Sequence, residues 1–326
     1  MIDIENKISK DCIHCGLCTQ NCDFLEKYDM CLQSFEDKPE LAYNCFLCGK
    51  CKIVCPMDID GREIALSMRK DHIENNSGKI NSKGYSGLIA EKQNYIFKNY
   101  KKVGKGKSAL FTGCNLLSYM PNTANKLIDE LHKHDIGVIF DCCGKPIAEL
   151  GFEEKEKIIL EKLNDKFKKN NIEELITACP NCYYYLNGKV DVKIVDIYTK
   201  LHELGIGNEI EREKIYLFRP CPDRETEEVK EKLYLFAKNS KLVDLNEQCC
   251  GAGGVASVKE SELAQGFRDD IKKQSKDKQI HTYCSTCTGF FRAEGINVTH
   301  ILTEILGVDE SKPGISLLNR LKYKFY

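Results

Sequence analysis

Residues 137–144 read GVIFDCCG, and residues 242–251 read LVDLNEQCCG. In both stretches a short apolar segment, typical of a buried β-strand, leads into a Cys-Cys-Gly triplet. The triplets are Cys142-Cys143-Gly144 and Cys249-Cys250-Gly251. An arrangement that occurs twice in one chain indicates an internal repeat, which predicts that the sequence around the two triplets also matches.

The cysteines around the two triplets keep the same order and spacing. A lone cysteine lies 28 residues before each pair, and a CxxC motif follows 36 residues after the first pair and 34 residues after the second. Such agreement over about 180 residues marks a duplication. The first copy consists of Cys114, Cys142, Cys143, Cys179 and Cys182. The second copy consists of Cys221, Cys249, Cys250, Cys284 and Cys287.

Short apolar segments precede the cysteines of each copy, and polar helical stretches at 154–169 and 225–238 connect them. Strands that alternate with helices predict an α/β unit with a largely parallel sheet. Ligands of such sheets gather at the strand ends. We therefore expect the five thiols of each copy to converge there.

The N-terminal region contains two further cysteine motifs with the spacing C-x2-C-x2-C-x3-C, which is typical of four-iron clusters in bacterial ferredoxins. In two-cluster proteins the fourth cysteine of each motif ligates the other cluster. This predicts one site at Cys12, Cys15, Cys18 and Cys55. It predicts the other at Cys45, Cys48, Cys51 and Cys22. Zinc is the alternative, but zinc sites use two CxxC pairs and not three closely spaced cysteines with a distant fourth.

Helical periodicity between the two motifs, over 24–43, and a further predicted helix over 61–70 complete this region. The region resembles the all-helical ferredoxin domain that occurs in iron–sulfur subunits of heterodisulfide reductase, of anaerobic glycerol-3-phosphate dehydrogenase and of fumarate reductase. The resemblance covers residues 1–75 and implies two [4Fe-4S] cubane clusters.

The duplicated region resembles the CCG domain of heterodisulfide reductase subunits B and D and of iron–sulfur subunits of glycolate, lactate and glycerol-3-phosphate oxidation. The resemblance implies that each complete set of five cysteines holds a noncubane [4Fe-4S] cluster, so the cysteines of both copies would be catalytic as cluster ligands. One departure is Arg219-Pro220-Cys221, which lacks the His often found just upstream of the lone cysteine. A zinc ion or a plain cubane on four of the five thiols is the alternative, because soft thiolates bind either metal.

These interpretations predict an α+β multidomain protein, in which an N-terminal all-α ferredoxin domain precedes a duplicated α/β CCG domain with largely parallel sheets. The expected domains are 1–75 for the ferredoxin domain, 76–107 for a connector, 108–206 for the first CCG repeat and 207–326 for the second. Cys31 lies outside every set, and we expect it to be a small buried apolar residue on the helix between the two motifs. Residues 251–256 fit the GxGxxA dinucleotide pattern, but their place directly after a cysteine pair favours wrapping of a cluster.

Composition supports a metal-binding role and excludes several classes of partner. The chain has 326 residues and 19 cysteines, no secretory signal at its N-terminus and no apolar run of membrane-spanning length. We therefore expect a cytoplasmic protein whose thiols remain reduced and free to bind metal. The 48 Lys and Arg residues balance 49 Asp and Glu residues, which argues against a nucleic-acid partner.

Taken with the resemblance, these patterns imply a cytoplasmic iron–sulfur oxidoreductase of the heterodisulfide-reductase type. Electrons would pass from the ferredoxin-domain clusters to the noncubane clusters, which would reduce a disulfide substrate. The alternative is an electron-transfer subunit of a flavoprotein dehydrogenase for lactate, glycolate or glycerol-3-phosphate, with no substrate site of its own. Both interpretations predict a flavoprotein redox partner, because the sequence has no convincing flavin site.

Overall fold

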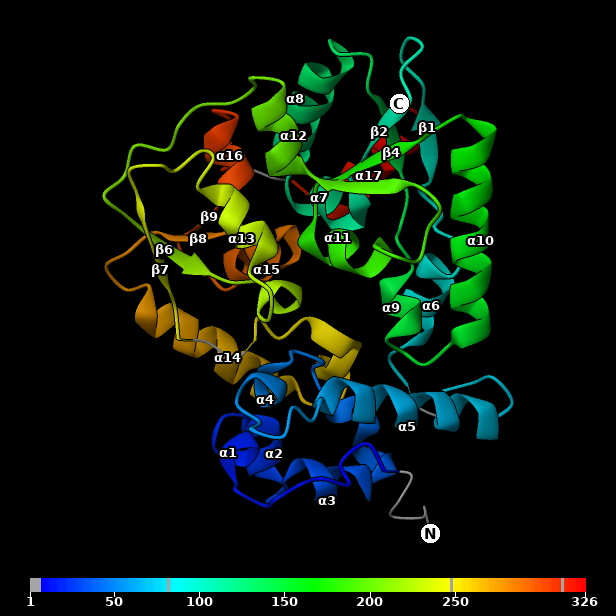
Figure 1. Cartoon of the computed structure of the whole chain (residues 1–326), viewed down its shortest axis with the longest axis vertical. Helices are drawn as coiled ribbons and strands as arrows, with labels where there is room; N and C mark the ends of the chain where they lie inside the picture. The colour runs from blue at the N-terminus through cyan, green and yellow to red at the C-terminus, as the bar shows by residue number, and fades with distance from the viewer. Residues whose placement is uncertain (1–6, 81–82, 247–248, 312–313) are drawn as a thin grey trace. The chain divides into compact units, whose positions relative to one another are not determined.

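The computed structural model describes residues 7–80, 83–246, 249–311 and 314–326 (Figure 1). The chain divides into two compact units, each built from three separate segments. The first unit comprises Met1–Ala90, Pro146–Glu156 and Asn246–Lys273. The second comprises Glu91–Lys145, Lys157–Leu245 and Gln274–Tyr326. Parts of both expected CCG repeats therefore belong to the same unit as the N-terminal cysteine motifs.

The regular elements of the first unit, among the described residues, are helices. They are α1 (Leu17–Gln20), α2 (Asp23–Lys27), α3 (Leu32–Glu36), η2 (Pro39–Asn44), α4 (Lys50–Ile53), α5 (Gly61–Asn75), α6 (Ser86–Lys92), η4 (Gly253–Val258) and α14 (Ser261–Gln274). Phe24 and Phe35 pack edge to face with ring centroids 5.2 Å apart and join α2 to α3. The longest of the N-terminal helices, α5, begins after Asp60, whose carboxylate accepts a hydrogen bond from the Arg62 amide.

The second unit contains two sheets. The five-stranded sheet has the order β1-β3-β2-β4-β5, and the four-stranded sheet has the order β7-β6-β8-β9. Only β1 runs antiparallel to its neighbour among the described strands. The strands are β1 (Asn99–Lys101), β2 (Ser108–Phe111), β3 (Gly137–Phe140), β4 (Glu174–Thr177), β5 (Lys193–Asp196), β6 (Lys214–Phe218), β7 (Lys241–Asp244), β8 (Ile280–Thr282) and β9 (Val298–His300).

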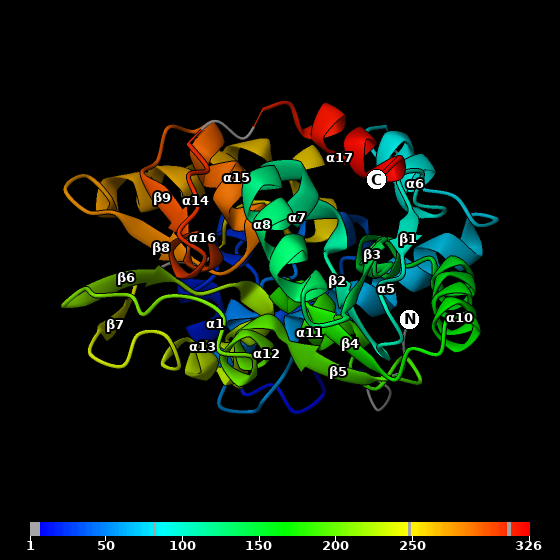
Figure 2. The ribbon, with the colours of Figure 1, turned by 90° about the horizontal axis from the view of Figure 1, so that it is seen from above.

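Helices cover the five-stranded sheet on both faces, since α10 lies on one side and α7 and α12 lie on the other (Figures 1 and 2). The remaining helices of this unit are α8 (Pro121–His132), α11 (Pro180–Leu186), η3 (Cys221–Asp223), α13 (Glu228–Leu233), α15 (Ser285–Ala293), α16 (Ile301–Ile305) and α17 (Ser316–Lys324). The three helices that flank the sheet are α7 (Gly113–Tyr119), α10 (Glu153–Lys169) and α12 (Ile197–Glu203), and α9 (Lys145–Ala148) precedes α10.

The two sheets share the order of their corresponding strands, which is the structural counterpart of the sequence duplication. In each sheet the strand before the lone cysteine lies between the strand before the Cys-Cys pair and the strand before the CxxC motif. One apolar core spans both sheets: Leu110, Val138 and Ile176 of the first belong to the same cluster as Ile215 and Leu217 of the second. The two repeats therefore stabilise each other through a common interior.

The prediction of a mixed helix and sheet protein with mostly parallel sheets is confirmed. Within the described part of the chain, no helix combines the length and the hydropathy that a bilayer span requires. The glycine-rich segment at 251–256 leads into the 3-10 helix η4, whereas a dinucleotide fingerprint opens an α-helix.

Candidate metal centres

The two N-terminal cysteine motifs fold by the same local backbone conformation. Gly16 and Gly49, which follow the second cysteine of each motif, have φ values of 75° and 74° and precede α1 and α4. The residue before the second cysteine is also left-handed, with φ of 52° at His14 and 51° at Leu47. Such values are uncommon outside glycine, and they wrap the chain tightly enough to direct successive thiols toward one point.

The first predicted set lies around one cavity. Cys12, Cys15, Cys18 and Cys55 all line it, together with Gly16. The first three come from one loop and α1, whereas Cys55 follows α4 of the other motif. The structure therefore brings these four thiols together across the two motifs, in the combination that the spacing predicts.

The second set also combines the two motifs, because Cys45, Cys48 and Cys51 belong to the second motif and Cys22 belongs to the first. Burial raises the pKa of Cys22, and the nearby thiols of Cys48 and Cys45 raise it further. Burial and the thiols of Cys22, Cys45 and Cys48 raise the pKa of Cys51 in the same way. Thiols that oppose one another's ionisation in this way stay protonated in the absence of a cation. A metal supplies that charge and deprotonates them, so this donor set fits an iron–sulfur cluster.

A buried arginine fixes the backbone around the second set. The Arg69 side chain is fully buried and donates hydrogen bonds to the carbonyl oxygens of Ala42 (3.0 Å), Glu149 (2.6 Å), Gly254 (3.0 Å) and Cys45 (2.8 Å). It therefore joins the second motif to both later segments of the first unit. Its role could not be read from the sequence, because no spacing relates residue 69 to these carbonyl groups.

The first CCG set converges at the ends of three neighbouring parallel strands. The lone Cys114 begins α7 after β2, the pair follows β3, and the CxxC motif opens α11 after β4. Side-chain hydrogen bonds link the five thiols in a continuous series: Cys114 to Cys142, Cys142 to Cys143, Cys143 to Cys182, and Cys182 to Cys179. The strand order β3-β2-β4 thus builds a single site from cysteines up to 68 residues apart.

The pKa values of two thiols in this set differ strongly from that of an ordinary cysteine. Hydrogen bonds from Cys142 and Cys182 lower the pKa of Cys143 to about 5. The hydrogen bond with Cys142 and burial raise the pKa of Cys114 well above its ordinary value. A Cβ at Gly113, where φ is 65°, would lie 3.1 Å from the Cys182 sulfur. The dense, largely buried donor set fits a group that binds several thiolates at once.

Residues from the expected connector cover this set. Lys92 is buried and forms an ion pair of 2.7 Å with Glu91. Burial opposes its charge, but Cys114, Cys142 and Glu91 raise the pKa of Lys92 above its ordinary value. The rings of Tyr95 and Phe97 pack with Cys142 and Cys114. The segment at 92–97 is thus part of the site, and not merely a link between domains.

A cavity of about 230 Å³ borders this site at Cys142. Its lining includes a hydroxyl, that of Tyr95, which is buried and has no hydrogen-bond partner among the described residues. One carboxylate, that of Asp141, also lines it and forms an ion pair with Lys166. The cavity is otherwise rich in cations: Lys92, Lys98, Lys162 and Lys166.

The second CCG set is divided between the two units. Cys221 lies in η3 after β6, and Cys284 and Cys287 lie at the start of α15 after β8, all in the second unit. Cys249 and Cys250 lie in the first unit, where the Gly251 amide donates to the Cys249 sulfur at 3.3 Å. The assignment of these five residues to one cluster stays a prediction.

The CxxC motifs of the two repeats meet within the second unit. Cys179 and Cys284 are joined by a side-chain hydrogen bond, and Cys284 is also hydrogen-bonded to Cys287. The Asn181 amide donates to the Cys284 sulfur at 3.5 Å. The hydrogen bonds with Cys179 and then Cys287 lower the pKa of Cys284 well below its ordinary value. The CxxC motif of one repeat therefore borders that of the other.

The position and exposure of Cys31 differ from those that the sequence predicts. It lies at the N-cap of α3, is partly exposed, and lines the same cavity as Cys12, Cys15, Cys18 and Cys55. The sequence places Cys31 outside every spacing pattern, so only the folded loop brings it to this cavity. It is not the buried apolar residue that the sequence predicts.

Comparisons with known proteins agree with this arrangement. The cysteine-rich domain family CCG matches residues 108–187 and 215–292, and the 4Fe-4S dicluster domain family matches residues 11–60. An iron–sulfur protein of Methanocaldococcus jannaschii, described as uncharacterized, is 25% identical over 87% of this chain and 67% of its own length. An uncharacterized iron–sulfur protein of Methanococcus maripaludis is also 25% identical, over 70% of this chain and 51% of its own.

A third relative has an assigned activity. This fumarate reductase (CoM/CoB) subunit of Methanothermobacter marburgensis is 25% identical over 75% of this chain and 55% of its own length. The chain thus spans about half to two thirds of the length of these relatives. Among solved structures, glutamate racemase RacE1 of Bacillus anthracis aligns with 62% of this chain and 80% of its own at a TM-score of 0.35 and 12% identity. The chain is an iron–sulfur electron-transfer protein that combines a 4Fe-4S dicluster domain with two cysteine-rich CCG domains.

Proposed function

We propose that this protein is an oxidoreductase of the heterodisulfide-reductase type, with two cubane sites in the N-terminal motifs and two noncubane sites in the CCG sets. The N-terminal sites would exchange electrons with a flavoprotein partner, and the CCG sites would act on a disulfide. The observation that favours substrate chemistry is the cavity of about 230 Å³ beside Cys142. A site that only relays electrons has no need of such a space next to its ligands.

The lining of the cavity favours an anionic substrate. Four lysines against one carboxylate give it an excess of positive charge. Its volume is below that of a pocket for a drug-sized molecule, so it would hold one charged end of the substrate. The Tyr95 hydroxyl, which lacks a partner among the described residues, can donate to the same group.

The contact between the two CxxC motifs suits a substrate with two sulfur atoms. Cys179 and Cys284 come from different repeats and are hydrogen-bonded to each other, so the two CCG sets border one another there. Reduction of a disulfide takes up two electrons and two protons and gives two thiols. Bound iron–sulfur clusters supply electrons one at a time. The buried Lys92 ammonium beside Cys114 and Cys142 can offset negative charge that develops at this site.

The first experiment is anaerobic purification followed by iron and acid-labile sulfide analysis. Four [4Fe-4S] clusters correspond to about 16 irons per chain. A value near 8 together with bound zinc would contradict clusters in the CCG sets. This measurement tests the cofactors without reference to any substrate.

The second experiment tests the substrate. The loaded protein is given reduced viologen and a panel of disulfides that carry carboxylate, sulfonate or phosphate groups, with neutral disulfides as controls. We expect turnover with anionic disulfides and a several-fold higher KM in a Lys162→Gln variant. Lys133→Gln should leave KM unchanged, because Lys133 is an exposed partner of Glu130 that does not line the cavity. Fast electron exchange with a co-purified flavoprotein, without turnover of any disulfide, would instead identify a relay subunit of a flavoprotein dehydrogenase.

A further inference from the structure

One cysteine of the first N-terminal site is in excess. The cavity lined by Cys12, Cys15, Cys18 and Cys55 is also lined by Cys31. A four-iron cluster takes four thiolates, one for each iron. Five thiols therefore surround a space in which four are needed.

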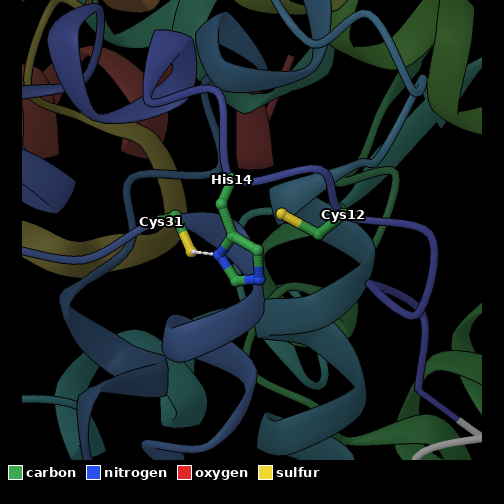
Figure 3. A group of neighbouring side chains, drawn as sticks. All are labelled: Cys12, His14 and Cys31. Carbon is green, nitrogen blue, oxygen red and sulfur yellow. Dashed lines mark hydrogen bonds between the residues drawn. The ribbon is translucent and has the colours of Figure 1, made fainter.

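The fifth thiol lies next to one particular member of the predicted set. The sulfurs of Cys12 and Cys31 and a ring nitrogen of His14 all lie within 4.8 Å of one another (Figure 3). Figure 3 shows the side chains of Cys12 and Cys31 on opposite sides of the His14 ring, with the Cys31 sulfur 3.7 Å from its Nδ1 atom. Cys31 therefore places a second thiol beside the one that the spacing predicts as a ligand.

Local hydrogen bonds hold Cys31 in this position. The Cys31 amide donates to the Ser34 hydroxyl at 3.0 Å, and the sulfur lies 3.5 Å from the same oxygen. The Cys31 side chain in turn accepts from the Ser34 amide, which completes a capping box at the start of α3. The loop position of Cys31 is therefore fixed by the fold and does not depend on a bound metal.

We propose that Cys31 is an alternative ligand of the first N-terminal cluster and replaces Cys12. In the exchange the iron–sulfur bond to Cys12 breaks and one to Cys31 forms. The proton that leaves the Cys31 thiol is taken up by the Cys12 thiolate, so neither electrons nor protons are gained or lost. The proposal rests on iron–sulfur occupancy of this site, which is part of the proposed function.

The second N-terminal motif provides a matched control. Cys45 holds the same position in its motif as Cys12, and the backbone of the two motifs is alike at His14 and Leu47. Among the described residues, the thiols that bear on the pKa of Cys45 and of Cys22 are themselves predicted ligands, with Cys48 acting on both. Removal of Cys45 should therefore leave its site one ligand short.

The experiment compares the full-length variants Cys12→Ala, Cys45→Ala, Cys31→Ala and Cys12→Ala/Cys31→Ala, purified without oxygen. Iron and sulfide per chain and the electron paramagnetic resonance spectrum of the reduced protein are measured. We expect Cys12→Ala and Cys31→Ala to keep the wild-type iron content, and Cys45→Ala and the double variant to lose about four irons each. Loss of iron from Cys12→Ala, or retention in the double variant at the level of Cys12→Ala, would overturn the proposal.

A chemical readout keeps the test independent of folding yield. Iodoacetamide labelling followed by peptide mass spectrometry reports whether the Cys31 thiol is free. We expect Cys31 to be labelled in the loaded wild-type protein and protected in loaded Cys12→Ala, with labelling restored after the iron is removed by a chelator. Labelling of Cys31 in loaded Cys12→Ala would overturn the proposal. Wild-type protein without iron would instead contradict the proposed function itself.

Discussion

The N-terminal sites and the first CCG site gather thiols by different physical means. In the N-terminal motifs, short spacings and left-handed residues such as His14 and Gly16 bring three cysteines together within one loop, and only the fourth comes from elsewhere. In the CCG set, three separate loops meet because β3, β2 and β4 are adjacent and parallel. The first kind of site depends on local backbone conformation, whereas the second depends on the whole sheet.

The largest expected effect separates the two kinds of site. Cys143 is hydrogen-bonded to both Cys142 and Cys182, so it lies in the middle of the thiol series of the first CCG set. We expect Cys143→Ser to lose about four irons while the spectra of the N-terminal clusters stay as in the wild type. The measurement is iron content with electron paramagnetic resonance. Simultaneous loss of the N-terminal signals would mean that the two regions do not assemble independently.

The next effect concerns the stability of the first unit. Substitution of Arg69 by Met leaves four carbonyl groups without their donor, two in buried and two in part-buried hydrogen bonds, and each unsatisfied buried group costs about 1–3 kcal/mol. We expect the free energy of unfolding of this unit to fall by about 3 kcal/mol or more, as measured by urea titration under argon. Lys70→Met is the control, because its ion pair with Glu153 is exposed and such pairs contribute at most about 1 kcal/mol. Equal effects of the two variants would contradict the role assigned to Arg69.

A pair of glycine variants compares backbone strain alone with strain plus crowding. Gly16 and Gly113 both have positive φ, so alanine costs each about 1 kcal/mol. A Cβ at Gly16 has only the Gln20 side chain nearby, at 3.8 Å, whereas at Gly113 it lies 3.1 Å from the Cys182 sulfur. We expect Gly16→Ala to retain its iron and Gly113→Ala to bind iron less tightly at the CCG set, as followed by the rate of iron release to a chelator. Equal release rates in the two variants would remove the distinction.

The smallest effect is electrostatic and tests whether Lys92 belongs to the CCG site. Loss of the buried positive charge of Lys92 makes reduction of a cluster bound by Cys114 and Cys142 less favourable. We expect Lys92→Met to lower the reduction potential of that site by roughly 60 mV, which is tenfold in the one-electron equilibrium constant. Lys98→Met, an exposed lysine on the same cavity, should shift it less. An unchanged potential in Lys92→Met, measured by redox titration, would exclude Lys92 from the electrostatics of the site.

The same contrast explains what the sequence can predict. The spacing of Cys12 to Cys55 predicts both N-terminal sets, because three cysteines of each set lie in one loop and the two-cluster ferredoxin pattern supplies the exchange of the fourth. The repeat spacing predicts the two sheets and the approach of Cys114 to the Cys-Cys pair. Lys92 and Tyr95 cannot be assigned from the sequence, because a residue of a connector acquires its role only when the chain packs against the thiols. The prediction that Cys31 is a core residue is wrong for the same reason.

The hydrogen bond between Cys179 and Cys284 limits which substitutions the two repeats can accept independently during evolution. Each repeat forms part of the surroundings of the other repeat's CxxC motif. A substitution beside one motif therefore also changes the surroundings of the other. We expect a fragment that ends near residue 206 to lack a complete wall around its own CxxC motif, even though all five of its thiols are present.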